Sequence, residues 1–196
     1  MDIDTPLREL GPIDSSALST AILSLGKDAW REEQVRQKSY DVHKQTESIV
    51  LMFIEIDDWP TIAVKKEAGW DRLADVAVPA MHDIIDRFYP TGGTIVRAMA
   101  AKLRAGSVIG SHQDVHPSFH SGHRIHVPIT TNSKVRFMID GRPYRFQVGQ
   151  AYEINNQKIH SVMNKGSEDR ITFIFDYIDP EEMQRIQDGA PKKALA

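Results

Sequence analysis

The chain has 196 residues, of which 41% are hydrophobic and 26% are charged, and its net charge is −3. This length suffices for one domain with a sizeable core, and so small a net charge gives no strong field to attract nucleic acid or an anionic membrane. Because the chain contains no cysteine, disulfides and thiolate metal sites are excluded.

The first 90 residues are expected to be mainly helical. Ser15 is a suitable N-cap and Gly26 a suitable stop for a helix with one apolar stripe, made by Ala17, Leu18, Ala21, Ile22 and Leu25. A second, polar helix is expected over residues 28–38. Residues 49–56 are rich in isoleucine, valine and phenylalanine, which predicts a buried strand. The longest purely apolar run, Ile49–Ile54, is far too short to span a membrane.

A long amphipathic helix is predicted next. Its apolar residues recur at i, i+3 and i+4 over about four turns: Leu73, Val76, Ala77, Ala80, Met81, Ile84, Ile85 and Phe88. Pro79 lies inside this pattern and is expected to kink the helix or divide it. The segment 89–93, with Pro90 and two glycines, then ends it.

From Thr94 onward the apolar period changes to two, which predicts short strands. Alternation is clear over 124–129, 135–139 and 170–177, and Asp140-Gly141 is a strong hairpin signal before 144–146. Several short strands at this spacing indicate a small antiparallel barrel or jelly roll, with the helices on one outer face.

We therefore predict a mainly β fold with N-terminal helices, a double-stranded β-helix (jelly roll, cupin-like). One domain is expected over residues 1–180, helical over 1–90 and β-helical over 91–180, followed by a polar tail, 181–196, disordered from Gly189. Residues 1–5 lack the basic-then-apolar pattern of a signal peptide. A cytoplasmic protein without membrane or nucleic-acid partners is expected, and the oligomeric state stays open.

His112, Asp114 and His160 have the composition of a 2-His-1-carboxylate triad, the usual seat of non-heme Fe(II). His112 and Asp114 are two residues apart, so in an extended segment they share one side. The gap to His160 holds about three strands, enough to return the chain to the same mouth. Such a triad leaves coordination positions open for a bidentate 2-oxo acid and O2, whereas a structural metal site would be closed.

A His-x-Asp pair alone is common, and solvated loop histidines are the alternative interpretation. His116, His120 and His123 lie in the same loop. These three are expected to lie outside the ligand set, either behind it, facing the substrate or exposed. The second histidine with its strand flanks, and an arginine in the next strand, favour the metal centre.

Arg170 begins a strand whose alternate residues are apolar, so its side chain should lie on the opposite face. Its planar fork suits bidentate binding of a carboxylate inside the barrel, although an arginine at a strand edge can also face solvent. Arg124 and His126 share a strand face opposite Ile125 and Val127. They predict an anion-lined pocket, with a solvent-facing surface as the alternative.

Four phrases in this order resemble the aspartyl/asparaginyl β-hydroxylase family of Fe(II)/2-oxoglutarate dioxygenases, which is similar to bacterial proline hydroxylases. They are Ser111-His112-Gln113-Asp114, Gly122 to Ile129, Ile159-His160-Ser161-Val162 and Asp169 to Tyr177, within a stretch from His112 to Pro180 that is about a third of the chain. The resemblance implies that His112 and His160 ligate iron, that Arg170 and His126 hold 2-oxoglutarate, and that Arg124 lies near a substrate or cosubstrate carboxylate.

The chain departs from that pattern at two places. Animal protein-modifying members lack the carboxylate ligand, which is present here as Asp114. They also carry an upstream hydroxyl residue that helps to hold the cosubstrate. Its approximate place here is Ala101, which has no hydroxyl.

We predict a hydroxylase that uses Fe(II), 2-oxoglutarate and O2 on an unactivated C–H bond of an amino acid, a small peptide-like metabolite or a protein residue. Arg124 is expected to bind a carboxylate of that substrate. Asp114 disfavours halogenation, because a halide would need its coordination position. The alternatives are a cupin-like Zn or Mn hydrolase or isomerase, which would need no clamp at Arg170, and a non-catalytic jelly-roll binding module.

Overall fold

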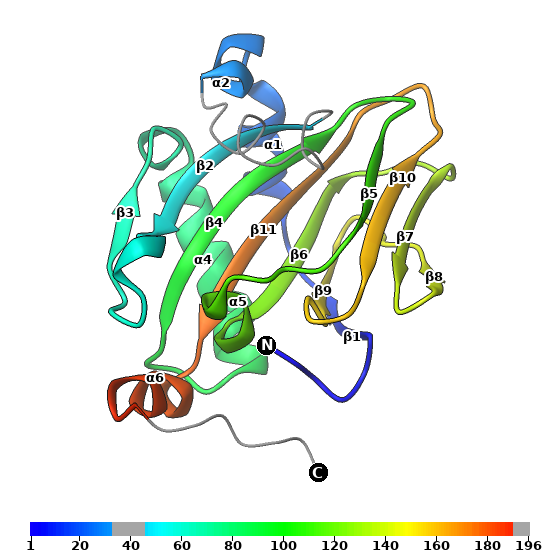
Figure 1. Cartoon of the computed structure of the whole chain (residues 1–196). Coiled ribbons are helices and arrows are strands. Elements are labelled where there is room, and N and C mark those ends of the chain that lie inside the picture. Colours follow the sequence, from blue (N-terminus) through cyan, green and yellow to red (C-terminus); the bar gives the residue numbers. More distant parts are fainter. Residues whose placement is uncertain (33–45, 190–196) are drawn as a thin grey trace.

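The computed structural model describes residues 1–32 and 46–189 as two antiparallel sheets, with the two longest helices on one side of the larger sheet (Figure 1). The strands of the larger sheet are β1 (Leu7–Pro12), β2 (Thr46–Ile54), β3 (Val64–Lys66), β4 (Thr94–Leu103), β6 (His123–Thr130), β9 (Gln150–Ile154) and β11 (Arg170–Ile178). Those of the smaller sheet are β5 (Val108–His112), β7 (Val135–Ile139), β8 (Arg142–Tyr144) and β10 (His160–Asn164).

The larger sheet has the strand order β1-β9-β6-β11-β4-β2-β3, and the smaller sheet has the order β5-β10-β7-β8. After β4 the chain alternates between the two sheets, except that the β7–β8 hairpin lies wholly in the smaller one. The chain therefore winds round a sandwich whose inner faces are opposite each other. This arrangement is a jelly roll, and the predicted fold class is confirmed.

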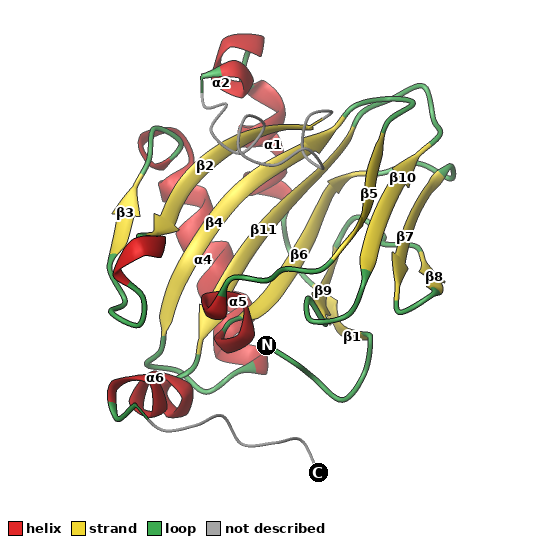
Figure 2. Ribbon diagram, viewed as in Figure 1, coloured by secondary structure: helices red, strands yellow, loops and turns green. Residues whose placement is uncertain are grey.

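The helices are α1 (Ser16–Ser24), α2 (Lys27–Arg31), α4 (Trp70–Phe88), α5 (Pro117–Ser121) and α6 (Pro180–Gln187), with a short 3-10 turn η2 (Ile56–Asp58). Figure 2 shows α1 and α4 on the face of the larger sheet that is turned away from the smaller sheet. Their buried side chains share one core with the outward residues of β2, β4, β6 and β11. Within residues 1–32 and 46–189, no helix has the length and apolarity needed to cross a membrane.

Strand β11 shows how alternation separates core from site. Ile171, Phe173, Phe175 and Tyr177 belong to the core beneath the helices. Successive side chains of a strand point to opposite faces. The side chain of Arg170, and those of every second residue after it, therefore point into the space between the two sheets. The predicted inward direction of Arg170 is confirmed, since its guanidinium carbon lies 5.9 Å from the ring centre of Phe137 on β7.

The two long helix predictions are mostly confirmed. In α1, Leu18 and Ile22 are buried, but Ser15 makes no side-chain cap bond. The Asp14 carboxylate instead accepts from the Ser16 amide at 3.0 Å. Helix α4 runs unbroken through Pro79, so the predicted division is wrong. Pro79 is exposed, and its ring therefore disturbs no packing.

The expected mainly helical character of residues 1–90 is wrong in part, because β1 and β3 lie there besides the predicted β2. Strand β1 pairs with β9, with Leu7 opposite Ile154. The predicted polar tail also begins as a helix, α6, whose Ile186 is buried against Ile54 and Val96. Of the predicted second helix, 28–38, residues 28–31 lie in α2, and residues 33–38 lie outside the described part, as do residues 190–196.

The predicted hairpin is confirmed. Asp140 and Gly141 both have positive φ, 51° and 73°, as a two-residue type I′ turn requires. Strands β7 and β8 pair on either side of it, with Ile139 opposite Arg142.

Candidate metal centre

Three side chains meet where β5 ends and β10 begins. The candidate ligand atoms of His112, Asp114 and His160 all lie within 4.8 Å of one another. His112 and His160 are opposite each other in the β5–β10 register, with ring centroids 4.3 Å apart. Asp114 follows two residues later in the loop, where its amide bonds the Asn156 carbonyl. The structure therefore brings together the three residues that the sequence analysis singled out.

Backbone carbonyls orient both imidazoles. Nδ1 of His112 lies 2.9 Å from the Gly110 oxygen, and Nδ1 of His160 lies 2.9 Å from the Lys158 oxygen. A carbonyl can only accept, so each Nδ1 carries the proton and each Nε2 carries the lone pair that ligates a metal. Burial lowers the pKa of His160, and the nearby charge of Arg124 lowers it further. A neutral ring is the form that binds metal.

A series of buried ion pairs holds Asp114 in place. Nη1 of Arg124 contacts the Asp114 carboxylate. Nε and Nη2 of Arg124 donate to Asp176, each at 2.8 Å, and Nη1 of Arg97 donates to the same carboxylate at 2.9 Å. Arg97 and Asp176 are each 1% exposed. The candidate carboxylate ligand thus rests on the inner face of β4, β6 and β11.

Asp176 is the shared anion of these ion pairs. Burial alone would raise the pKa of Asp176, but the guanidinium groups of Arg124 and Arg97 hold it far below its ordinary value. Burial lowers the pKa of Arg97, against the charge of Asp176. The aspartate accordingly stays ionised and shares its charge between two arginines. A negative charge of this kind offsets the cost of burying two cations beside a metal site.

Arg124 was expected to meet a substrate carboxylate, and its guanidinium is already engaged by Asp114 and Asp176. The substrate role stays a prediction. A guanidinium has five N–H donors, and three nitrogens with one bond each leave a second N–H on each terminal nitrogen. Any substrate group bound there would join the existing network instead of meeting an isolated cation.

A cationic patch lies further along the same inner face. Arg170 is 5% exposed, and none of the acidic groups in the described ranges forms an ion pair with it. Burial lowers the pKa of Arg170 to about 10, so the group is charged at neutral pH. Both ring nitrogens of His126 and the hydroxyl of Thr172 are buried without a hydrogen-bond partner in the described part of the chain. Polar atoms in this state are rare in folded proteins and need a partner.

Aromatic rings from β7 and from the segment after β8 close this patch. The His126 ring lies 5.6 Å from Phe137 and 6.0 Å from Phe146, both nearly edge-on. The Phe137 ring also stacks on His160 at 6.3 Å. One aromatic side chain therefore borders both the metal triad and the cationic patch, so the two features belong to a single site.

The other histidines of the segment lie outside the triad. His116 caps α5, with its Nδ1 bonded to the Ser118 hydroxyl at 2.7 Å, and His120 is exposed. His123 points to the opposite side of β6, where its Nδ1 lies 2.5 Å from Glu153 and its Nε2 lies 3.4 Å from Asp179. Their expected place beyond the ligand set agrees with the structure.

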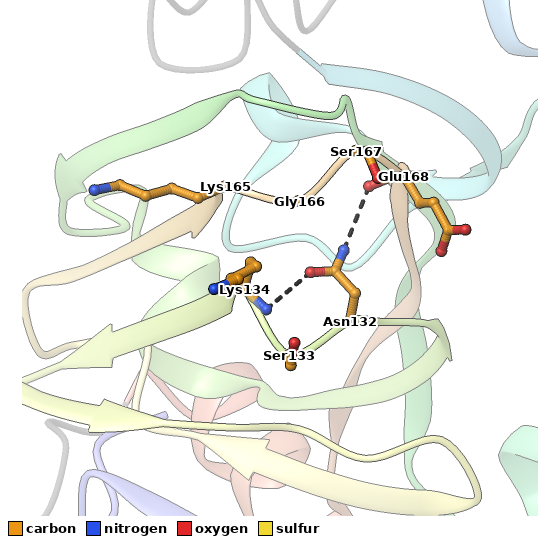
Figure 3. Close-up of a pocket in the computed structure, with 7 residues that line it drawn as sticks. All are labelled: Asn132, Ser133, Lys134, Lys165, Gly166, Ser167 and Glu168. Atoms are coloured by element: carbon orange, nitrogen blue, oxygen red, sulfur yellow. Dashed lines mark hydrogen bonds between the residues drawn. The ribbon is translucent and has the colours of Figure 1, made fainter.

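A separate pocket of about 360 Å³ lies between the turns that join β6 to β7 and β10 to β11 (Figure 3). Asn164 and His160 stand at opposite ends of β10, so this pocket is remote from the triad. Its floor is structural, since the Asn132 amide donates to the Asn164 side chain at 3.2 Å. A Cβ at Gly166 would meet the Asn132 amide at 2.5 Å, and glycine is therefore needed there.

Three side chains of the site were not singled out from the sequence: Arg97, Thr172 and Asp176. Arg97 lies between the apolar residues Val96 and Ala98, and Asp176 lies between Phe175 and Tyr177. A charged residue inside a buried strand is the signal that identifies both, because such residues are almost never fully buried unless paired. Thr172 gave no such signal, since threonine is common in strands.

Comparison with known proteins agrees with this geometry. The model of the family described as aspartyl/asparaginyl beta-hydroxylase matches residues 20–180. None of the curated proteins matches the chain.

Several solved structures share the fold. A prolyl hydroxylase from Trichoplax adhaerens, in complex with a peptide fragment of the hypoxia inducible factor oxygen degradation domain, has a TM-score of 0.57 and 14% identity over 92% of this chain and 87% of that one. A 2OG-Fe(II) oxygenase family oxidoreductase from Burkholderia pseudomallei has a TM-score of 0.55 and 13% identity over 69% of each chain. The non-heme monooxygenase ThoJ, as a nickel complex, has a TM-score of 0.54 and 15% identity over 89% and 74%.

Proposed function

The chain belongs to the aspartyl/asparaginyl β-hydroxylase family, and from this premise we propose that it is an Fe(II)/2-oxoglutarate-dependent dioxygenase. It would hydroxylate an unactivated C–H bond of an amino acid, a peptide or a protein residue. One observation carries the proposal, namely that His112, Asp114 and His160 converge within 4.8 Å beside the buried cation of Arg170.

The triad fits Fe(II). Two imidazoles and one carboxylate are the donor set of non-heme iron sites that keep positions open. When bound, the iron supplies the activation of O2 that an unreactive C–H bond requires. The protein's own part is to hold both rings in the Nε2-presenting tautomer, and to keep the Asp114 carboxylate in place through Arg124.

The cationic patch fits the cosubstrate. 2-Oxoglutarate carries a distal carboxylate, and Arg170 offers a planar fork with no acidic partner among the described residues. His126 lies beside it with unpartnered ring nitrogens. Burial raises the strength of a charge-assisted hydrogen bond because water does not compete for it. We therefore assign Arg170 and His126 to the cosubstrate, with Phe137 covering them.

The substrate would enter on the Asp114 side of the triad, where the neighbouring Val115 is exposed. We propose that Arg124 binds a carboxylate of the primary substrate through its remaining N–H groups. An amino acid or peptide-like substrate provides that carboxylate or carbonyl chemistry, and the Trichoplax relative was solved with a peptide. A cytoplasmic location stays a prediction that cell fractionation would test.

The test is a screen for succinate release. Protein loaded with Fe(II) is given 2-oxoglutarate, O2 and a panel of amino acids and peptides, and products are examined for a gain of one oxygen atom. His160→Ala should lose all turnover, whereas Arg142→Ala, on the exposed β7–β8 hairpin, should keep it. Hydrolysis or isomerisation with Zn or Mn and no 2-oxoglutarate would favour the cupin-like alternative. Failure to bind any metal would favour a binding module.

A further inference from the structure

Four aromatic side chains gather around the segment that follows Asp114. They are Phe53 near the end of β2, Trp59 after η2, His116, and Phe119 on α5. The His116 ring lies 6.2 Å from Trp59 and 6.4 Å from Phe119, in both cases nearly edge-on. All four side chains are partly exposed. We call these four residues the aromatic wall.

The aromatic wall lies against the two arginines that support Asp114. The Phe119 ring centre is 4.1 Å from the guanidinium carbon of Arg97 and 4.6 Å from that of Arg124. Phe53 contacts Arg97 in the same way, at 4.9 Å. Contacts of this kind are favourable. A substrate carboxylate bound to Arg124 would therefore bring the rest of the substrate against the Phe119 ring.

The backbone holds the Phe119 ring in place. Its carbonyl accepts from Nδ2 of Asn156 at 3.1 Å and from Nε2 of Gln157 at 3.2 Å, and its amide donates to the His116 carbonyl at 2.9 Å. The Asn156 carbonyl in turn accepts from the Asp114 amide at 3.4 Å. The loop between β9 and β10 thus supports both the ring and the candidate metal ligand.

The charges beneath the aromatic wall balance one another. Arg97 and Arg124 carry two positive charges, and Asp114 and Asp176 carry two negative charges, joined by ion pairs. One substrate carboxylate can use the remaining N–H groups of Arg124. A second carboxylate, on the substrate side chain, would lie against aromatic surface. Burial of an unpaired charge is costly, whereas burial of an apolar side chain against such rings is favourable.

We propose that the aromatic wall is the side-chain subsite of the primary substrate, and that it selects a substrate with one carboxylate and an apolar side chain over aspartate and asparagine. Phe119 is the specificity-determining residue, because its ring contacts the arginine that would take the carboxylate. Val115, which is 80% exposed, extends the apolar surface next to Asp114. This inference rests on the proposed function.

The experiment compares three side chains of similar shape, presented as the free amino acids leucine, asparagine and aspartate and as their glycyl dipeptides. Binding is measured by calorimetry, without O2, on the full chain loaded with Mn(II) and 2-oxoglutarate. The variants are Phe119→Ala, which removes the ring, and Phe119→Leu, which keeps apolar surface. Phe88→Ala on α4 is the matched control, because Phe88 is also partly exposed and lies 4.8 Å from an arginine, Arg87.

The parent should bind leucine or its dipeptide about tenfold or more tightly than the asparagine and aspartate counterparts. Phe119→Ala should reduce this ratio to about threefold or less, since most of the apolar contact is lost. Phe119→Leu should keep most of the preference, and Phe88→Ala should keep all of it. The affinities for Mn(II) and 2-oxoglutarate should be the same in all four proteins.

Three results would overturn this inference and leave the proposed function standing. They are a parent preference for asparagine or aspartate, an unchanged ratio in Phe119→Ala, and no binding of either leucine compound by a parent that binds Mn(II) and 2-oxoglutarate. A metal-loaded parent that does not bind 2-oxoglutarate would overturn the proposed function together with the inference.

Discussion

Replacing Arg170 by methionine should separate what this residue does for the fold from what it does for the ligand. The guanidinium is 5% exposed, and burial lowers its pKa from 12.5 to about 10. At about 1.4 kcal/mol for each pKa unit, keeping it charged inside the folded protein costs about 3 kcal/mol at neutral pH. Methionine has a similar length and no charge, so Arg170→Met should make the ligand-free protein as stable as the parent or up to about 3 kcal/mol more stable.

Ligand binding should change in the opposite direction. Loss of a buried charge-assisted pair costs on the order of 2–5 kcal/mol, so the affinity for 2-oxoglutarate should fall by about 30-fold or more. Arg170→Lys, which keeps the charge but loses the planar fork, should lie between the parent and Arg170→Met. Metal affinity should stay unchanged in both variants.

The assay is urea denaturation with Mn(II), in the absence and presence of 2-oxoglutarate. The parent should gain stability from the ligand by mass action, and Arg170→Met should gain little. Arg142→Met, the same change at an exposed position, is the control. A ligand-free Arg170→Met protein that is less stable than the parent, yet still stabilised by 2-oxoglutarate, would refute this reasoning.

Three further predictions concern charged groups around the site. Asp176→Asn should cost about 3–5 kcal/mol of unfolding free energy in denaturation experiments, and should weaken metal binding about 10- to 100-fold because the support of Asp114 is lost; unchanged metal affinity would contradict the supporting role. At saturating Fe(II), Arg124→Lys should lower the ratio of hydroxylated product to succinate if Arg124 binds the substrate, whereas an unchanged ratio would remove that role. Burial alone would lower the pKa of His123, but hydrogen bonds to Asp179 and Glu153 raise it above the usual 6.5, so its stabilising charge is complete below about pH 6.5 and is lost as the pH rises through the raised value. Between about pH 6 and pH 9, the free energy of unfolding measured with urea should therefore fall more steeply in the parent than in His123→Gln. The same pH dependence in both proteins would argue against a stabilising charge on His123.

Local sequence patterns were sufficient where neighbouring residues decide the structure. The period of β11 placed Arg170 on the inner face, and Asp140-Gly141 specified a turn that needs positive φ at both positions. They were insufficient for β1, whose partner β9 is far away in the chain. Short edge strands of this kind gain their order from the neighbour, which no local pattern reports.

The site residues also fall into those that the local sequence identifies and those that depend on distant strands. Residue types and spacing were enough to select His112, Asp114 and His160, because metal ligands must be chemically distinctive. The chain from Arg97 through Asp176 to Arg124 depends on the register of three strands. Pro79 is a related case, since its identity predicted a kink or a break, whereas α4 continues through this exposed position.

The most direct test of the central claim is an anaerobic titration of Fe(II) and 2-oxoglutarate, followed by visible absorption and by calorimetry. We predict that the parent binds one Fe(II), and that one 2-oxoglutarate then binds with a new iron-to-ligand charge-transfer band. His160→Ala should fold normally, bind no Fe(II) at the same concentrations and show no band. Full iron occupancy and the same band in His160→Ala would contradict the assignment of His112, Asp114 and His160 as the metal centre.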